Sequence, residues 1–266
     1  MSGQWLQPSA LALAFCLALG LLTWLCSLWR RDASLADRIW PVSIAGAGLL
    51  QIFVAPGPAS TRTLLMALLG TVWAWRLGLF VTIRNWGHGE DRRYRDMRER
   101  NAPHFGWKSL YLVFGLQAVL AWVVAAPFLA GQMGERAWGW GDAVGAAIAS
   151  FGIVFESVGD AQLARFRADP ANRGRVMDRG LWRFTRHPNY FGEACVWWGL
   201  WGMAVSGAGW LGAWSVVSPL LMTVLLLKVS GVGLLEKDIA DRRPGYRDYI
   251  ARTNAFVPGP PRRTTP

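Results

Sequence analysis

Seven long apolar stretches alternate with polar connectors along the chain, and they run approximately over 9–29, 39–56, 63–83, 108–130, 142–159, 189–206 and 210–233. A helix crosses the hydrocarbon core of a bilayer in about 20 residues, so these stretches are long enough, or nearly so, to span a membrane. No basic residue precedes Arg30, and the first stretch is too long for the apolar region of a signal peptide. We therefore expect an all-α integral membrane protein with about seven transmembrane helices.

Lys and Arg residues fall on every second connector. Segments 30–38, 84–108, 160–188 and 234–266 hold 3, 7, 7 and 7 of them, whereas the opposite connectors hold Arg62 and Arg136. Because cytoplasmic connectors are rich in Lys and Arg, this pattern predicts an N-terminus outside and a C-terminus in the cytoplasm. It also explains the net charge of +11 by topology and lipid headgroups, so we expect no nucleic-acid partner.

Composition agrees with this fold class, since 53% of the residues are hydrophobic and 17% are charged. Cys16, Cys26 and Cys195 lack the spacing of a zinc site or a disulfide framework, so we expect buried thiols and no metal. We predict a single membrane domain over 1–258 and a disordered tail over 259–266. The oligomeric state is left open.

Candidate chemistry is concentrated in segment 156–193, at the start of the sixth apolar stretch. Pro188 suits the first turn of a helix and His187 can cap it, which points the positive end of the helix dipole toward the preceding arginines. Such an arrangement favours an anion, and phosphate is the obvious one. Asn189 and Glu193 are four residues apart and share a helix face. Their donors and acceptors suit a nicotinamide carboxamide or a ribose.

A plainer interpretation stays open for this segment, in which the arginines face lipid headgroups and Asn189 and Glu193 form a structural contact. Two other cytoplasmic segments carry polar and aromatic residues. Segment 84–107 holds Trp86, His88, Tyr94 and His104 among charges of alternating sign, which is also typical of a solvated surface. Segment 236–250 places Glu236, Tyr246 and Tyr249 near the membrane surface, and a solvated C-terminal helix is the alternative there. Arg76, inside the third stretch, needs an anionic partner, for which Glu156, Asp160 and Glu193 are candidates.

Three motifs occur in order: GEDRRY at 89–94, RGLW followed by RHPNYFGE at 179–193, and GYRDYIARTNAFVPG from Gly245. With these motifs, roughly residues 60–258 resemble the steroid 5α-reductase-like superfamily, in particular its bacterial branch. RHPNY alone is less specific, because sterol C14-reductases and isoprenylcysteine carboxyl methyltransferases share it. The resemblance implies a seven-helix fold in the bacterial inner membrane, with NADPH in a cytoplasm-facing cavity and a lipid or steroid-like substrate entering from the bilayer.

The resemblance also implies roles for individual residues. Asn189 and Glu193 match the Asn and Glu that hold the cofactor in the steroid enzymes, and Asp160 matches a cofactor-binding Asp. Arg167 and Arg175 match arginines that bind its phosphates, and Arg76 matches an arginine of the third span. We expect the other candidates of these motifs and of the last segment to complete the cofactor site: His187, Tyr190, Glu236 and Tyr246.

The catalytic end of the pattern departs from the steroid reductases. Those enzymes carry a Gln-Glu pair in the second span and a Tyr in the third, which polarise the substrate carbonyl. Here Gln51 is followed by Ile52, and the third stretch offers Trp73 and Trp75. A 3-keto-steroid substrate is therefore in doubt. Gln51, with Tyr94 and His88 of the other polar segment, are the remaining catalytic candidates.

Three functions remain open from the sequence. The first is an NADPH-dependent reductase of a C=C or C=O bond in a lipid, in which an acid must supply a proton. The second is a methyltransferase that uses S-adenosylmethionine, a cofactor without phosphates. The third is a non-catalytic lipid-binding protein. The arginines of segment 160–188 favour the reductase.

Overall fold

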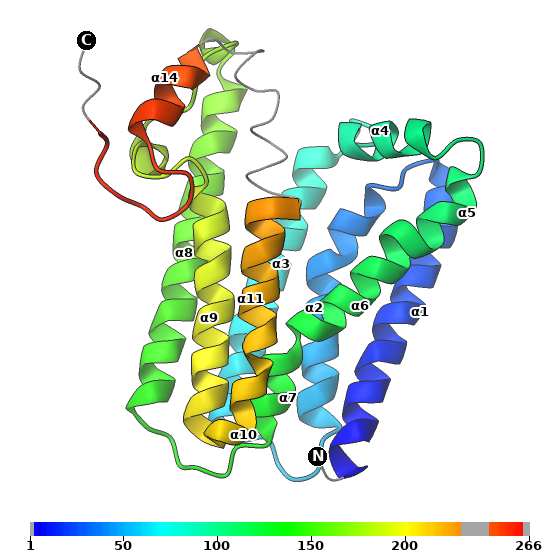
Figure 1. The fold of residues 1–266 in the computed structure, drawn as a ribbon, viewed down its shortest axis with the longest axis vertical. Coiled ribbons are helices and arrows are strands. Elements are labelled where there is room, and N and C mark those ends of the chain that lie inside the picture. Colours follow the sequence, from blue (N-terminus) through cyan, green and yellow to red (C-terminus); the bar gives the residue numbers. More distant parts are fainter. Residues whose placement is uncertain (1–2, 230–244, 263–266) are drawn as a thin grey trace. The chain divides into compact units, whose positions relative to one another are not determined.

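A computed structural model of the chain describes residues 3–229 and 245–262, and within these ranges every regular element is a helix (Figure 1). The described residues form two compact units. The first unit comprises 1–143 and 201–218, and the second comprises 144–200 and 219–266. The single domain predicted over 1–258 stays a prediction, and each unit is described separately below.

The helices follow the predicted apolar stretches closely. The long helices are α1 (Leu6–Arg30), α2 (Leu35–Phe53), α3 (Thr61–Asn85), α8 (Trp140–Ala168) and α9 (Pro188–Ala208). The fourth stretch is a continuous series of α5 (Phe105–Ser109), the π-helical η2 (Leu110–Gly115), α6 (Leu116–Val124) and α7 (Ala126–Gln132). The seventh is a series of α10 (Trp210–Ala213), η5 (Trp214–Val216), α11 (Val217–Val224) and η6 (Leu225–Val229). The connectors and the C-terminal segment add α4 (Arg92–Arg100), the short 3-10 turns η1 (Gly3–Trp5), η3 (Pro170–Asn172) and η4 (Gly180–Arg183), and α14 (Gly245–Arg252).

Five helical stretches of the described chain are long and apolar enough to cross a membrane: Gly3–Arg30, Thr61–Asn85, Phe105–Gln132, Trp140–Ala168 and Trp210–Val229. The prediction of an all-helical protein with several apolar spans is thus confirmed for these residues. Helices α2 and α9 correspond to the two other predicted spans but are not among the five. Seven spans and the direction of the termini stay predictions.

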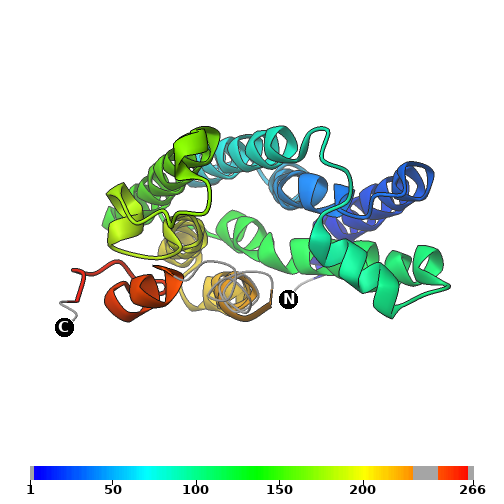
Figure 2. The ribbon, with the colours of Figure 1, turned by 90° about the horizontal axis from the view of Figure 1, so that it is seen from above.

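In the first unit, α1, α2 and α3 lie side by side, and α6 and α7 pack against them (Figure 2). Phe128 of α7 fits between α2 and α3 because two glycines leave room for its ring. A Cβ at Gly48 would lie 2.5 Å from Phe128 Cδ2, and one at Gly70 would lie 2.6 Å from Phe128 Cζ. Small residues at helix contacts are the usual means of close packing in membranes.

Cys26 corrects one expectation about the cysteines. Cys16 is buried and Cys195 is half-buried, and all three thiols are free, but Cys26 is exposed. It lies on the same face of α1 as the exposed Leu22 and Trp29, which are four residues before it and three after it. This apolar face is suited to contact lipid.

A buried ion pair fixes the start of α3 in the first unit. Arg62 Nε lies 2.5 Å from Asp142 Oδ1, and Arg62 NH2 lies 2.9 Å from Asp142 Oδ2. The side chains are 3% and 0% exposed. The Arg62 guanidinium also donates to the carbonyl oxygens of Arg136 and Ala137. Such a bidentate pair, with further bonds from NH2 to backbone carbonyls, tolerates burial well.

In the second unit, glycines bring α8 and α9 into backbone contact. A Cβ at Gly152 of α8 would lie 2.5 Å from the Gly192 oxygen. One at Gly192 of α9 would lie 2.6 Å from the Glu156 nitrogen, and one at Gly199 would lie 2.5 Å from the Gly145 oxygen. The two helices therefore have no room for side chains along this line, and polar residues beside it are held close together.

The C-terminal segment of the second unit folds back on the start of α9. Gly259 N donates to the Phe184 oxygen (3.0 Å), and Arg262 N donates to the Arg252 oxygen (2.8 Å). Gly259 and Arg262 thus have backbone partners in the second unit, and the disordered tail expected over 259–266 stays a prediction. Residues 263–266 lie outside the described chain.

Candidate functional site

Four polar side chains lie along the contact between α8 and α9 in the second unit. Glu156 and Asp160 are one turn apart on α8 and are 1% and 3% exposed. Asn189 and Glu193 are one turn apart on α9, with Glu193 6% exposed. Placing three carboxyl groups out of water costs free energy, so a buried set of this kind in an apolar helix pair is a candidate functional site.

The start of α9 brings two of these residues into direct contact. Pro188 is the first residue of the helix, as the sequence predicts. Gly159 of α8 packs against it, since a Cβ there would lie 3.2 Å from Pro188 Cγ and 3.3 Å from Asn189 N. At this short separation Asn189 Nδ2 donates to Asp160 Oδ1 (3.1 Å), although the residues are 29 apart in sequence.

The Asp160 contact fixes the orientation of the Asn189 amide. An ionised carboxylate only accepts hydrogen bonds, so the NH2 group of Asn189 must face it and the amide oxygen must point elsewhere. Asn189 Oδ1 is buried and has no hydrogen-bond partner among the described residues. A buried acceptor without a donor costs about 1–3 kcal/mol. Asn189 thus presents an acceptor that an N–H or O–H group of a ligand can satisfy.

The RGLW segment covers α8 next to this pair. Trp182 Nε1 donates to the Gly159 oxygen (3.0 Å), and Leu181 N donates to Gln162 Oε1 (2.9 Å). Gly180, at a φ of 58°, allows the tight turn and lies against Gln162. The turn is therefore fixed on both sides of Asp160, and its sequence is explained by this docking.

Arg186 and Thr185 connect the RHPNY motif to the C-terminal segment. The Arg186 guanidinium donates to the oxygens of Thr253 (2.5 Å) and Ile250 (3.3 Å), at the end of α14. Thr185 Oγ1 donates to the Phe256 oxygen (2.8 Å), and Arg186 N donates to the Asn254 oxygen. Arg186 is buried. Two of the motifs that carry the resemblance thus form one structure.

Aromatic rings complete the region around the start of α9. The His187 and Tyr190 rings stack at 5.3 Å with an interplanar angle of 3°, and His187 is buried. Tyr246 and Tyr249 of α14 meet edge to face at 5.5 Å, and Tyr249 Oη donates to the Trp182 oxygen. His187, Tyr190 and Tyr246 therefore belong to the same unit as Asp160 and Asn189. Glu236 lies outside the described residues.

Two open hollows lie beside this region. One, of about 540 Å³, is here named the Arg175 hollow and is lined by Gly174, Arg175, Val176, Asp178, Gly245, Asp248 and Arg252. The other, of about 850 Å³, is named the Arg183 hollow and is lined by Asp178, Arg179, Gly180, Arg183, Arg252, Thr253, Pro261 and Arg262. Arg167 is exposed on the last turn of α8.

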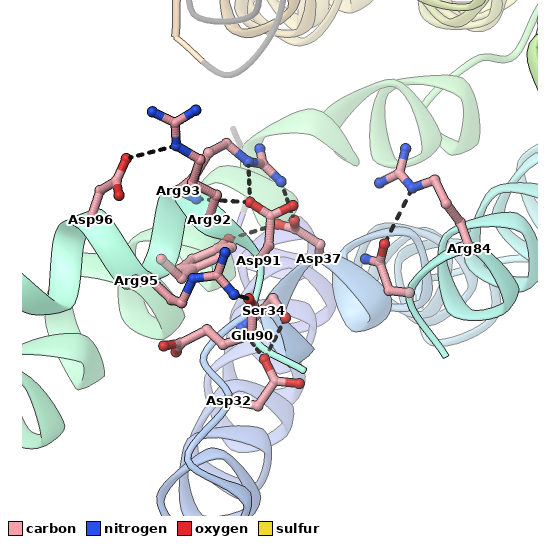
Figure 3. Close-up of polar contacts among 12 residues, drawn as sticks. Asp32, Ser34, Asp37, Arg84, Glu90, Asp91, Arg92, Arg93, Arg95 and Asp96 are labelled. Carbon is pink, nitrogen blue, oxygen red and sulfur yellow. Dashed lines mark hydrogen bonds and ion pairs between the residues drawn. The ribbon is translucent and has the colours of Figure 1, made fainter. Parts of the chain in front are cut away.

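The first unit holds a separate network of polar residues at one end, where α4 meets the turn between α1 and α2 (Figure 3). Asp37 of α2 accepts from Tyr94 Oη (2.6 Å) and from Arg93 NH2 (2.7 Å). Gln117 Nε2 donates to Tyr94 Oη (3.3 Å). Burial, the charge of Asp37 and the hydrogen bond to it raise the pKa of Tyr94 well above its ordinary value. Tyr94 is thus a poor proton donor, and its hydroxyl already donates a hydrogen bond to Asp37.

Glu90 holds the α1–α2 turn in the same network. Its carboxylate accepts two hydrogen bonds from Arg98 (2.9 and 2.7 Å) and one from Ala33 N (2.8 Å). Burial opposes ionisation, but the hydrogen bonds from Arg98 and Ala33 and the Arg98 charge outweigh it and lower the pKa of Glu90. The GEDRRY motif at 89–94 therefore has a structural role here, because it binds the connector after α3 to the α1–α2 turn.

The three catalytic candidates lie apart within the first unit. Gln51 is 1% exposed, and its Oε1 has no hydrogen-bond partner in the described chain. It lies 14 residues after Asp37 on α2, which is about 21 Å along the helix, so it is remote from Tyr94. His88 is exposed, with Nδ1 2.9 Å from the Trp86 oxygen of its own connector. Arg76 is half-buried in α3 of this unit.

Some important residues escape reasoning from sequence. Gln162 and Trp182 position the wall beside Asp160, and neither belongs to a pattern that reveals this role. The burial of Tyr94 has a weak signal, since Tyr94 and Met97 are three apart in an otherwise charged helix and face one side.

Comparisons with known proteins give a family but no activity. The model of a family described as “Protein of unknown function (DUF1295)” matches residues 23–253. An uncharacterized protein of Schizosaccharomyces pombe is 27% identical over 283 residues, which cover 95% of this chain and 80% of the relative. No solved structure matches the chain. The matched range includes both the Asp160–Asn189 pair and the network around Glu90.

Proposed function

The chain belongs to the family described as “Protein of unknown function (DUF1295)”, and we propose that it is an integral membrane reductase. In this proposal the protein uses NADPH to reduce a C=C or C=O bond of a lipid or steroid-like molecule. The observation that carries it is the buried oxygen of Asn189, oriented by Asp160 and open to a donor from a ligand.

The membrane location is supported by the distribution of exposed tryptophans in the first unit. Trp29, Trp86 and Trp107 lie at the end that carries α4, and Trp138, Trp140, Trp210 and Trp214 lie at the end of the Arg62–Asp142 pair, whereas the exposed Trp75 lies within α3. Tryptophan is enriched at both interfaces of a membrane. Together with the Lys and Arg distribution, this favours seven spans with the α4 end in the cytoplasm.

The residues of the second unit fit a nicotinamide cofactor in two respects. A carboxamide offers an N–H donor of the kind that Asn189 Oδ1 lacks. Arg167 on the last turn of α8 and Arg175 in the connector that follows are exposed guanidinium groups and suit phosphates. Arg186 is excluded from that role, since its guanidinium holds the carbonyl oxygens at the end of α14.

The protein's own groups would orient the cofactor and exclude water. NADPH, when bound, supplies a hydride to one carbon of the substrate double bond, and a proton must reach the other atom. Tyr94 is disfavoured as that proton source by its bond to Asp37 and its raised pKa. Gln51 suits a different task, because a buried amide can hydrogen-bond a substrate oxygen.

The test is a titration of the purified full chain in mild detergent with NADPH, NADH and S-adenosylmethionine, followed by thermal shift. We expect saturable stabilisation by NADPH. Asn189→Ala and Arg175→Ala should each weaken NADPH binding about tenfold, because each removes one polar contact worth ~1–2 kcal/mol. Arg165→Ala, which removes an exposed arginine of the same connector, should not.

Other outcomes would decide against the reductase. Stabilisation by S-adenosylmethionine alone would favour the methyltransferase, whose cofactor needs no arginine cluster. No response to any nucleotide by folded protein would favour a non-catalytic lipid-binding protein. Equal loss of affinity in the Arg165→Ala control would show that the arginines act only through their summed charge.

A further inference from the structure

The Arg183 hollow combines a strong positive charge with open guanidinium groups. Four arginines and one aspartate among its lining residues give a net charge of +3. Arg252 pairs with Asp178, and Arg262 donates to Asn254 Oδ1 (3.3 Å). The guanidinium groups of Arg179 and Arg183 make no hydrogen bond or ion pair with any residue that the structure describes.

The walls of this hollow are built by specific backbone contacts. One wall is the 3-10 turn η4, which is docked on α8 through Leu181 and Trp182. The other is the C-terminal segment, which Gly259 and Arg262 hold in place through their backbone N–H groups. Arg179 and Arg183 therefore project from a fixed turn, so that less side-chain and backbone freedom is lost when an anion binds.

Apolar side chains stand beside the same turn. Phe184, directly after Arg183, is 43% exposed, and Val257 of the opposing segment is 61% exposed. The two segments are joined by the hydrogen bond from Gly259 N to the Phe184 oxygen. Helix α9, a predicted span, begins four residues after Phe184. Arginines next to exposed apolar groups at the end of a membrane helix are typical of the lipid headgroup region.

We propose that the Arg183 hollow binds the phosphate of an anionic phospholipid headgroup, with Arg179 and Arg183 as its principal donors. Guanidinium groups form paired hydrogen bonds with phosphate oxygens. Arg252 neutralises Asp178, so the single carboxylate in the lining does not repel the ligand. The proposal rests on the membrane location given above and not on the cofactor.

The hollow is distinct from the proposed cofactor contacts. Arg175 lines the neighbouring hollow, and the Asp178–Arg252 ion pair belongs to the linings of both. Arg179 and Arg183 line the Arg183 hollow and are absent from the lining of the Arg175 hollow. A variant of these two arginines should therefore separate lipid binding from cofactor binding.

The experiment uses the full chain in a neutral detergent, titrated with short-chain phosphatidylglycerol, short-chain phosphatidylcholine and inorganic phosphate. We expect phosphatidylglycerol to raise the thermal midpoint far more effectively than the other two. In Arg179→Gln with Arg183→Gln, the apparent affinity should fall roughly 30-fold, at about fivefold for each arginine at a membrane surface. The charge-matched control, Arg165→Gln with Arg173→Gln, should retain most of the affinity.

Several results would overturn the proposal. Equal losses in the two double variants would show that only net charge matters. Inorganic phosphate as effective as the lipid would identify a site for free phosphate. A loss of NADPH affinity in Arg179→Gln with Arg183→Gln, equal to the loss of lipid affinity, would place the hollow in the cofactor site. If wild-type protein binds the lipid but no nucleotide, this proposal stands and the reductase fails.

Discussion

The network around α4 in the first unit and the contact between α8 and α9 in the second unit differ in how their central polar groups are satisfied. Around α4 in the first unit, Asp37 and Glu90 each accept hydrogen bonds from at least two donors, and the hydroxyl of Tyr94 both donates and accepts. In the second unit, Asn189 is held by Asp160 on one side while its buried oxygen has no partner in the described chain. Carboxylates and a hydroxyl that already have protein partners stabilise a fold, whereas a held but unsatisfied acceptor is suited to a ligand.

The largest test of this comparison is the buried pair in the first unit. Arg62→Met should destabilise the protein by about 3–5 kcal/mol, because it leaves Asp142 buried without its cation. Adding Asp142→Leu should recover much of the loss, and denaturant titration measures both variants. Arg100→Met, at the exposed end of α4, serves as the control and should change stability little. A mild effect of Arg62→Met would contradict a structural role for the pair.

The second test moves to the unsatisfied site. Asp160→Asn should weaken NADPH binding about tenfold, or ~1.4 kcal/mol, because an amide both donates and accepts and no longer fixes the orientation of Asn189. Its thermal midpoint should fall less than that of Arg62→Met. Asp169→Asn, in the exposed turn after α8, is the matched control. Unchanged NADPH affinity in Asp160→Asn would remove the positioning role of Asp160.

Tyr94→Phe separates structure from catalysis in the first unit. Asp37 loses one donor and keeps Arg93, so we expect a loss of about 1 kcal/mol in stability. Cofactor affinity and turnover per folded molecule should be unchanged. The opposite result, lost turnover with wild-type stability, would identify Tyr94 as the proton donor despite its bond to Asp37.

The smallest expected effect is the contribution of Glu90 to the loss of stability at acid pH. Because the pKa of Glu90 is lowered on folding, its contribution is fully present above its ordinary value of 4.5 and is lost as the pH falls through the folded value. Arg98 is partly exposed, so we expect less than about 1 kcal/mol. Glu90→Gln should make the thermal midpoint less dependent on pH below 4.5, where the wild-type contribution is lost. An equally steep profile in this variant would assign the acid sensitivity to other carboxylates.

Local pattern was sufficient to predict the helices. The apolar stretches predicted over 63–83 and 142–159 appear as α3 and α8. Helix α3 extends two residues further at each end, whereas α8 begins two residues earlier and ends nine residues later, at Ala168. Pro188 begins α9 because a proline lacks the N–H that the first turn cannot use. These features depend on residues close together in the chain.

Contacts between distant residues could not be read in the same way. Arg62 and Asp142 are 80 residues apart, and the sequence shows one as a connector charge and the other as the start of a helix. The alternating charges of segment 84–107 suggested a solvated surface, yet Tyr94 is buried there against Asp37. The family resemblance assigned Asp160 and Asn189 to the same cofactor site. The hydrogen bond between their side chains depends on the close glycine contact of α8 and α9, which the sequence did not reveal.

The RGLW turn is covered by the C-terminal segment, which is synthesised later, so the turn cannot complete its contacts when it is first made. The Trp182 oxygen accepts a hydrogen bond from Tyr249, and the ribosome adds Tyr249 to the chain 67 residues after Trp182. At ~5–20 residues per second, this interval lasts about 3–13 s, while a helix forms within about a microsecond. The turn before α9 is therefore made several seconds before the segment that covers it. During those seconds the Trp182 oxygen lacks the hydroxyl that covers it, so the speed of translation over residues 183–249 sets how long the turn stays uncovered.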